Sequence, residues 1–212
     1  MNFEPQQDDE VSRFYITIPQ NRIGALIGPK GRVKQRIEEM AGVDIEIDSG
    51  SGDVCVSSTD DTEDPFLVIK ARDFVTAVGR GFNPETAYHL LEDDIYLEII
   101  NLKLVVGTNP NKIMRFRGRI IGREGRTRNV IEETTGTKIS VFGNTVGIIG
   151  PYERVKVARE AIYLILEGSK HGTVYAYLEE RAQQMRFDTR ELWDKASRDK
   201  KDWLQRMSYY EN

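Results

Sequence analysis

An internal repeat constrains the fold of this chain more than any other feature of its sequence. The stretch GRIIGREGRTRNVIEETTGTKISV at 118–141 aligns without a gap on GALIGPKGRVKQRIEEMAGVDIEI at 24–47. The shared positions include both glycines of a Gly-x-x-Gly pattern, which are Gly28 and Gly31 in the first copy and Gly122 and Gly125 in the second. The repeat therefore predicts two domains of the same fold.

Each copy has the residue order of two helices joined by a very tight turn. The second helix begins at a basic residue, Arg32 or Arg126, and ends at a glycine, Gly42 or Gly136. Glycine permits a turn that is too tight for a Cβ, and such a turn leaves backbone N–H groups open where the second helix starts. Since the helix dipole favours an anion at that end, the turn is a candidate phosphate site.

Hydrophobic periodicity predicts one element order in both halves: strand, helix, turn, helix, strand, strand, helix. In the first half the elements are expected at 12–18, 20–27, 32–41, 43–47, 54–56 and 65–78, with a short helix at 84–91. In the second half they are expected at 96–106, from 110 onward, and at 127–135, 137–142, 145–149 and 151–166. The acidic residues 92–94 are the expected boundary between the domains.

The charge distribution is more informative than the formal net charge of -4, which gives no reason to expect a polyanion as partner. Residues 112–138 contain eight Lys or Arg against three Glu, and residues 22–36 contain five basic residues and no acid. Both glycine turns are therefore expected in local positive fields. The strand after each turn differs, with Asp44, Glu46 and Asp48 in the first copy and Lys138 and Ser140 in the second. A nucleic-acid strand should meet less repulsion on the second domain.

In this context, IGPKG at 27–31 and IGREG at 121–125 resemble the turns of eukaryotic-type KH domains, and the resemblance covers about 11–168 in two copies. It implies an α+β fold of two tandem type I KH domains, each a three-stranded antiparallel sheet packed on three helices. The domains would span 11–92 and 95–168, followed by a helical extension at 169–212. In this family the turn clamps about four single-stranded nucleotides, and the apolar groove beside it receives the bases.

Carried over position by position, the resemblance implies a set of RNA-binding residues. The clamp would comprise Gly28, Pro29, Lys30 and Gly31 in the first domain and Gly122, Arg123, Glu124 and Gly125 in the second, helped by Arg32 and Arg126. The groove would be lined by Gly24, Ile27 and Ile45 in one domain and by Gly118, Ile121 and Ile139 in the other, with Arg119 and Lys138 adding positive charge. Base specificity would come from base edges held in the groove, which the motif alone does not identify.

The second copy, RGRIIGREGRTRNVIEETTGT at 117–137, resembles archaeal relatives of the KH protein that partners the Nob endonuclease in maturing the small ribosomal subunit. That resemblance implies binding of single-stranded RNA near the 3′ end of small-subunit ribosomal RNA or its precursor, with no catalytic activity. It also implies two protein partners, the PIN-type endonuclease that cuts the precursor and the alpha subunit of initiation factor two. The first turn is degraded in eukaryotic relatives but intact here, which argues against a purely structural first domain.

A protein-interaction scaffold with KH folds as docking surfaces is the alternative function, and the net acidity permits it. An enzyme is not expected, because the chain shows no cluster of carboxylates or metal ligands. His89 and His171 are isolated and Cys55 is expected in the core, so we expect neither a metal nor a cofactor. The recurring pairs Glu38-Glu39 and Glu132-Glu133 are interpreted as solvated surface.

The two ends of the chain lie outside the repeat. Residues 1–12 show no targeting pattern and no apolar run is long enough to span a bilayer, so a cytoplasmic protein is expected. The sequence of residues 173–186 predicts a helix that packs on the second domain. The charged stretch 187–212 contains Trp193, Trp203, Tyr209 and Tyr210. These aromatic residues anchor a protein partner, cover the second domain or belong to a frayed terminus.

Overall fold

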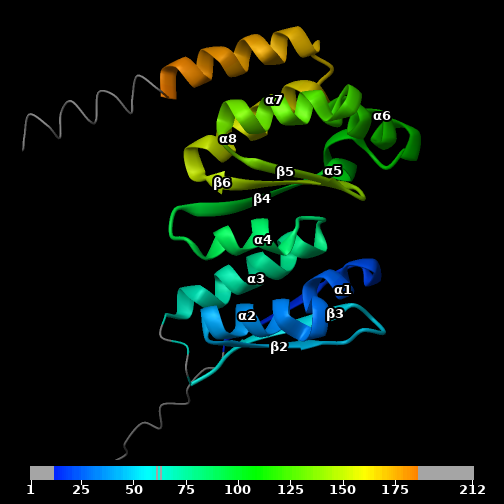
Figure 1. Ribbon diagram of the computed structural model, residues 1–212. Helices are drawn as coiled ribbons and strands as arrows, with labels where there is room; N and C mark the ends of the chain where they lie inside the picture. The colour runs from blue at the N-terminus through cyan, green and yellow to red at the C-terminus, as the bar shows by residue number, and fades with distance from the viewer. Residues whose placement is uncertain (1–11, 61, 63, 186–212) are drawn as a thin grey trace, which may run out of the picture.

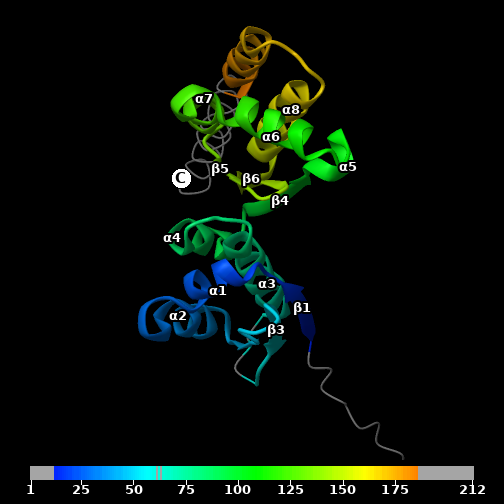
Figure 2. The same cartoon turned by 90° about the vertical axis from the view of Figure 1, so that its right-hand side faces the viewer.

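The computed structural model describes residues 12–60, 62 and 64–185 as two α+β domains that are stacked on each other. Figures 1 and 2 show four layers, in which the helices of the first domain lie between its own sheet and the sheet of the second domain. The helices of the second domain cover the far side of that second sheet. Both domains have the predicted fold class, and the predicted order of elements is confirmed except for one additional helix in the second domain.

The first domain begins with β1 (Arg13–Thr17), α1 (Gln20–Ile27), the 3-10 turn η1 (Pro29–Gly31) and α2 (Arg32–Ala41). It continues with β2 (Val43–Ile47), β3 (Asp53–Ser58), α3 (Pro65–Gly79), α4 (Pro84–Ala87) and η2 (Tyr88–Leu91). The strands form an antiparallel sheet in the order β1-β3-β2. The Asp64 and Asn83 side chains cap α3 and α4, and each is followed by proline at the first helical position.

The second domain comprises β4 (Ile95–Asn101), α5 (Leu102–Val106), α6 (Pro110–Ile121) and the 3-10 turn η3 (Arg123–Gly125). It continues with α7 (Arg126–Thr135), β5 (Lys138–Phe142), β6 (Thr145–Pro151) and α8 (Tyr152–Leu166), and its antiparallel sheet has the order β4-β6-β5. The predicted strand at 96–106 is wrong in its last five positions, which form α5 instead. The Asn101 side chain accepts a hydrogen bond from the Lys103 N–H and so starts a helix, and Leu102 and Val106 are buried one turn apart.

Each domain buries the helix and strand positions that the repeat pairs. Ile37 and Ile131 on the second helix of each copy are both fully buried, at 0% exposure. At the end of α2, Ala41 is buried and Met40 is exposed. Tertiary packing of these apolar faces stabilises helices that are too short to be stable alone.

The outer face of the second sheet is not open to solvent, because the first domain covers it. Ile149 of β6 belongs to the buried core of the first domain, and Ile95 and Leu97 of β4 pack against the same core. Phe82, which follows α3, is buried against Gly147, where an added Cβ would lie 2.5 Å from the Phe82 ring. Burial on both faces accounts for the nearly unbroken apolar sequence of β6.

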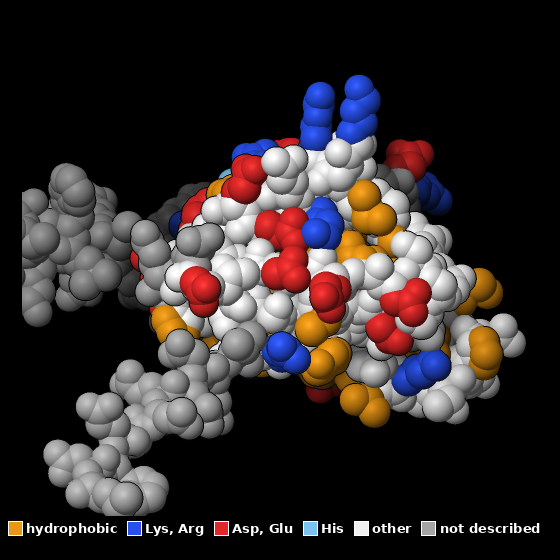
Figure 3. Space-filling view, turned by 90° about the horizontal axis from the view of Figure 1, so that it is seen from below, with side chains coloured by type: hydrophobic (Ala, Val, Ile, Leu, Met, Phe, Trp, Pro, Cys, Tyr) orange, Lys and Arg blue, Asp and Glu red, His pale blue; other side chains and the backbone are white. Residues whose placement is uncertain are grey.

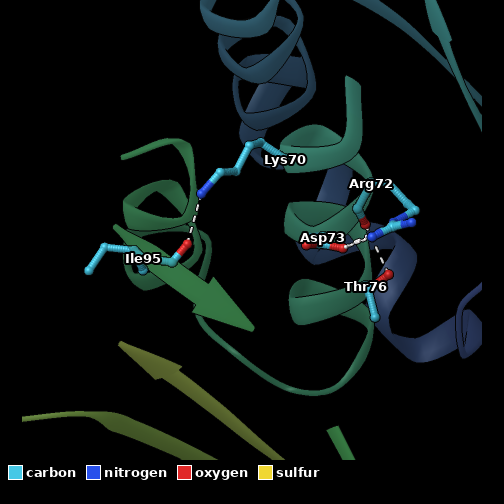
Figure 4. Close-up of polar contacts among 5 residues, drawn as sticks. All are labelled: Lys70, Arg72, Asp73, Thr76 and Ile95. Carbon is cyan, nitrogen blue, oxygen red and sulfur yellow. Dashed lines mark hydrogen bonds and ion pairs between the residues drawn. The ribbon is translucent and has the colours of Figure 1, made fainter. Parts of the chain in front are cut away.

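The linker between the domains is held by a buried lysine. Lys70 of α3 is only 5% exposed, and its ammonium donates to the carbonyl oxygens of Glu92 and Ile95, both at 2.8 Å. Figure 4 shows the Lys70 side chain reaching from α3 to the start of β4. The predicted boundary at 92–94 thus lies in a fixed connection, and the two domains share an interface.

A further helix over residues 171–185 packs on the second domain, as predicted for 173–186 up to the last described residue. Val174 and Leu178 are buried in the core of that domain. The four aromatic residues predicted to anchor a partner or to cover the second domain lie outside the described residues. Within the described ranges, no helix is both long enough and apolar enough to cross a membrane.

The outer face of the first sheet differs from its counterpart, since no part of the described chain buries it. Alternate positions of β2 and β3 point outward, and among them Asp44, Glu46 and Asp53 are exposed. Figure 3 shows acidic side chains scattered over this side of the molecule. Tyr15 of the edge strand β1 lies on the same face and is 76% exposed.

Candidate nucleic-acid interface

The two glycine turns have the same backbone conformation. The first glycine has φ 71° in Gly28 and φ 75° in Gly122, and both have ψ 176°. An added Cβ would come within 2.3 Å of a side-chain atom of Val33 at Gly28 and of Thr127 at Gly122. Glycine is therefore required at this position in both copies, both for its positive φ and for the close approach of the following helix.

The residue before the second glycine is strained in both turns. Lys30 and Glu124 have φ 55° and φ 52°, and they are the only described residues other than glycine with positive φ. A left-handed conformation at such a residue costs about 1 to 3 kcal/mol and persists where the surrounding structure imposes it. Strain retained at the same position of both copies marks the turns as candidate functional sites.

The turns present their backbone to solvent. Arg123, Glu124 and the following Arg126 are exposed, and no side chain of the described residues caps α7. In the first copy Pro29 occupies the position of Arg123, so that turn has one backbone N–H fewer to offer a phosphate. The second turn is therefore the better anion site by backbone donors alone.

The helix before each turn carries an open glycine. Gly24 of α1 and Gly118 of α6 are exposed, and a Cβ added at either would have no atom within 4 Å. Packing within the protein does not require glycine here, whereas a ligand lying close to the helix backbone would. Ile27 and Ile121, at the ends of these helices, are half-buried and border the same surface.

Two predicted groove residues lie in the core and not on the surface. Ile45 is fully buried, at 0% exposure, and Ile139 is 5% exposed. Successive side chains of a strand point to opposite faces of the sheet, and both isoleucines lie on the inward face of their strands. The outward positions of β5 are Lys138 and Ser140. Ile45 and Ile139 thus support the groove from below, and their predicted part in lining it stays a prediction.

Two glutamates that were interpreted as solvated surface have a structural role at the groove. Glu132 of α7 accepts a hydrogen bond at 2.6 Å from the backbone N–H of Ile139, and Glu38 of α2 accepts one at 2.9 Å from Ile45. Each carboxylate fastens the edge strand of its sheet to the helix that follows the turn. The interpretation was wrong for this member of each pair, and the signal that could have revealed it was the equal spacing of seven residues in both copies.

The predicted basic residues are of two kinds. Arg123, Arg126 and Lys138 in the second domain are exposed, as are Lys30 and Arg32 in the first. Arg119 is different, because its guanidinium donates to the carbonyl oxygens of Ile165 and Ser169 and so fixes the chain after α8. Arg119 therefore anchors the C-terminal segment, and its contribution of positive charge to the groove stays a prediction.

Arg22 is also not a free cation. Its guanidinium donates to the carbonyl oxygens of Val78 and Phe82 at 2.8 and 2.6 Å and lies 5.8 Å from the centre of the Phe142 ring. Partial burial lowers the pKa of Arg22 from its ordinary value, although the group stays charged. Arg22 connects α1, the end of α3 and β5, and so belongs to the interface between the domains.

Comparison with known proteins places both domains in one fold family. Residues 96–183 match the eukaryotic-type KH domain (KH-domain type I) of the second PNO1 domain, and residues 12–93 match the first KH domain of Krr1. A KH domain-containing protein of Methanocaldococcus jannaschii is 46% identical over 86% of this chain and 79% of that protein. The chain belongs to the KH-domain family of PNO1 and Dim2.

Two further members of the PNO1 and Dim2 family illustrate its range. The pre-rRNA-processing protein PNO1 of Coccidioides immitis is 28% identical over 81% of this chain and 68% of that protein. The crystal structure of an a/eIF2alpha-aDim2p-rRNA complex from Pyrococcus horikoshii OT3 contains a chain that is 47% identical, with a TM-score of 0.79. The match covers 85% of this chain and 99% of that chain. The higher identity to archaeal proteins agrees with the resemblance seen in the second repeat.

The titratable residues outside the grooves of this PNO1 and Dim2 relative are dispersed. Cys55 is half-buried on the outer face of the first sheet, so its expected place in the core is corrected. His89 pairs with Glu92 at 2.7 Å, and His171 Nε2 lies 2.9 Å from the carbonyl oxygen of Arg119. Among the described residues no three His, Cys, Asp or Glu side chains are grouped to hold a metal ion.

Proposed function

We propose that this protein is a non-enzymatic RNA-binding factor of small ribosomal subunit biogenesis. Its second KH domain grips single-stranded RNA near the 3′ end of small-subunit ribosomal RNA or its precursor. The observation that carries the proposal is the exposed turn of Gly122 to Gly125, strained at Glu124 and followed by the uncapped start of α7. The relatives support the RNA class, since they include pre-rRNA-processing proteins and a member of an rRNA complex.

The second domain is the better candidate for the main grip. Its turn has an additional backbone donor at Arg123, and its edge strand presents Lys138 where the first domain presents Asp44. Opposite charge beside the groove attracts phosphates, and the acid repels them. The intact first turn, with Lys30 and Arg32 exposed, supports a weaker additional contact.

Protein partners form the second part of the proposal. The acidic outer face of the first sheet disfavours RNA and is open, which favours a role of this surface in docking a protein. On the family resemblance, the proposed partners are the alpha subunit of initiation factor two and a PIN-type endonuclease, both met in the cytoplasm. A scaffold that uses its KH folds mainly for docking is the second candidate function, and recovery of RNA-free complexes with normal stoichiometry would favour it.

The test is a salt-controlled binding titration with a single-stranded RNA of the 3′-terminal small-subunit rRNA sequence and a shuffled control RNA. In one variant Arg123→Asp and Glu124→Asp alter the second turn, and in the matched variant Pro29→Asp and Lys30→Asp alter the first. Asp tolerates the left-handed conformation, so both variants should fold. We expect a much larger loss of affinity in the second-turn variant, and a salt slope smaller by about 0.7 for each phosphate that the variant no longer neutralises. Equal losses, no losses, or equal affinity for the shuffled RNA would overturn the proposal.

A further inference from the structure

An open pocket lies where the first domain meets the edge strand of the second sheet. Its volume is about 380 Å³, within the range of small-ligand sites. One wall is formed by the segment 81–86 of the first domain, and the other by β5 together with Arg128 and Glu132 of α7. Neither domain would form this pocket alone.

The pocket is continuous with the groove of the second domain. Arg128 follows the glycine turn by three residues on α7, and Glu132 lies one turn of helix further and bonds the Ile139 N–H of β5. A strand that leaves the turn along α7 toward β5 therefore reaches the segment 81–86. The first domain supplies a wall that an isolated KH domain lacks.

The walls are held in fixed positions by close contacts. Gly81 approaches β5 so closely that an added Cβ would lie 2.8 Å from both Ser140 Oγ and Phe142 Cβ. The Ser140 hydroxyl donates to the Arg80 carbonyl oxygen at 2.9 Å. Because these contacts involve backbone and small groups, the pocket is formed before any ligand arrives, which lowers the entropic cost of binding.

The second-domain wall of the pocket carries two cationic side chains and the carboxylate of Glu132, and the first-domain wall carries neutral polar groups. On the second-domain wall, Arg128 Nε is buried and has no hydrogen-bond partner among the described residues, the nearest Glu132 oxygen lies 3.9 Å from it, and Lys138 is exposed. On the first-domain wall, Asn83 Oδ1 caps α4, and among the described residues its amide nitrogen has no partner. Thr86 is half-buried beside it, and its hydroxyl forms no bond within the described part of the chain.

We propose that this pocket receives one nucleotide of the RNA strand held by the second KH domain. The phosphate lies toward Arg128 and Lys138, and the base edge lies toward Asn83 and Thr86, whose amide and hydroxyl both donate and accept hydrogen bonds. The first domain thus contributes to base selection within the groove of the second. This inference rests on the proposed function and adds to it a specific site.

The test is a thermodynamic cycle between protein and RNA variants. The pocket variant carries Asn83→Ser, which keeps the helix cap, and Thr86→Val, which keeps the shape of the side chain. The control variant carries Asn109→Ser at the cap of α6 and Thr173→Val, both outside the pocket. Full-length proteins are titrated with a series of single-stranded RNAs in which each position in turn is made abasic, and thermal melts confirm folding.

For the intact RNA, we expect the pocket variant to bind at least about fivefold more weakly than wild type, while the control variant binds normally. At one position of the strand, removal of the base should weaken wild type but have no further effect on the pocket variant. Pocket and control variants of equal affinity, or additive effects at every position, would overturn the inference. The proposed function would still hold in that case if the second-turn variant lost binding, and it would fail separately if wild type did not bind RNA.

Discussion

Substitutions of Gly118, the exposed glycine of α6, should weaken RNA binding without destabilising the protein. Gly118 lies in a helix, and a Cβ added there would meet no atom within 4 Å. Gly118→Ala should therefore stabilise the folded protein by about 1 kcal/mol, because glycine is the poorer helix former. For a chain of this length that unfolds as one unit, this corresponds to a rise in Tm of about 2–4 °C. Gly118→Leu should fold equally well, with its side chain in the space assigned to RNA.

The same substitutions should impair RNA binding in order of size. A leucine at Gly118 would displace a base or the strand beside it, at a cost comparable with the loss of one stacked base, about 1–3 kcal/mol. That is a loss of affinity of about fivefold to more than a hundredfold. Binding is measured by fluorescence anisotropy at fixed salt, and stability by thermal melting of the same samples.

The matched control for Gly118 is Gly24, which occupies the same position in the first domain and is equally open. Gly24→Leu should change Tm similarly and weaken RNA binding less, since the second domain holds the main grip. A Gly118→Leu protein that is stable and binds RNA as tightly as wild type would refute the placement of RNA over α6.

Three further substitutions test the supporting contacts. Lys70→Met should lower the free energy of unfolding by about 2 kcal/mol, measured by urea denaturation, because the linker carbonyls lose a charged donor. Glu132→Ala should cost about 1–2 kcal/mol and increase hydrogen exchange at the Ile139 amide, since β5 loses its bond to α7. Gly147→Ala should cost about 1–3 kcal/mol by collision with the Phe82 ring, and combining it with Phe82→Ala should show strong non-additivity in a double-mutant cycle.

The Lys70 and Glu132 substitutions have matched controls, and all three substitutions have an opposing outcome. Lys103→Met and Glu133→Ala change exposed residues of the same types and should be nearly neutral. If the Lys70→Met protein were as stable as its control, water would replace the ammonium as donor to the linker carbonyls without loss of stability. Normal exchange at Ile139 after loss of Glu132 would show that the edge strand does not depend on this bond. Additive effects of Gly147→Ala and Phe82→Ala would contradict direct contact between the domains.

The repeat was sufficient to predict both domains, their element order and the positions of the turns. Residues 24–47 and 118–141 contain local information, because glycine positions and helix periodicity act within a few turns of chain. The prediction of secondary structure failed in an apolar run outside the repeat, because that run is compatible with both a strand and a helix. Residues 102–106 look like strand by composition, whereas the Asn101 cap and the burial of Leu102 and Val106 one turn apart favour a helix.

The remaining differences arise from contacts between segments that are distant in sequence. Arg22 and Arg119 lie in the basic stretches around the two glycine turns, as cations of the grooves would. Each nevertheless donates hydrogen bonds to backbone carbonyl oxygens 46 or more residues away. The repeat could not predict that the first domain covers the second sheet. It reveals only the sequence positions that the two domains have in common, and therefore says nothing about how the domains contact each other. The orientation of Ile139 could not be predicted from the repeat either, because an apolar residue beside a groove can face the groove or the core.

The most direct test of RNA binding by the second glycine turn is a map of backbone amide chemical shifts on titration with single-stranded RNA of the 3′-terminal small-subunit rRNA sequence. We predict that the largest changes fall on the turn 122–126 and along β5, with smaller changes at the turn 28–32. Changes that are confined to the outer face of the first sheet, or that are absent from the turn 122–126, would contradict this placement of the RNA.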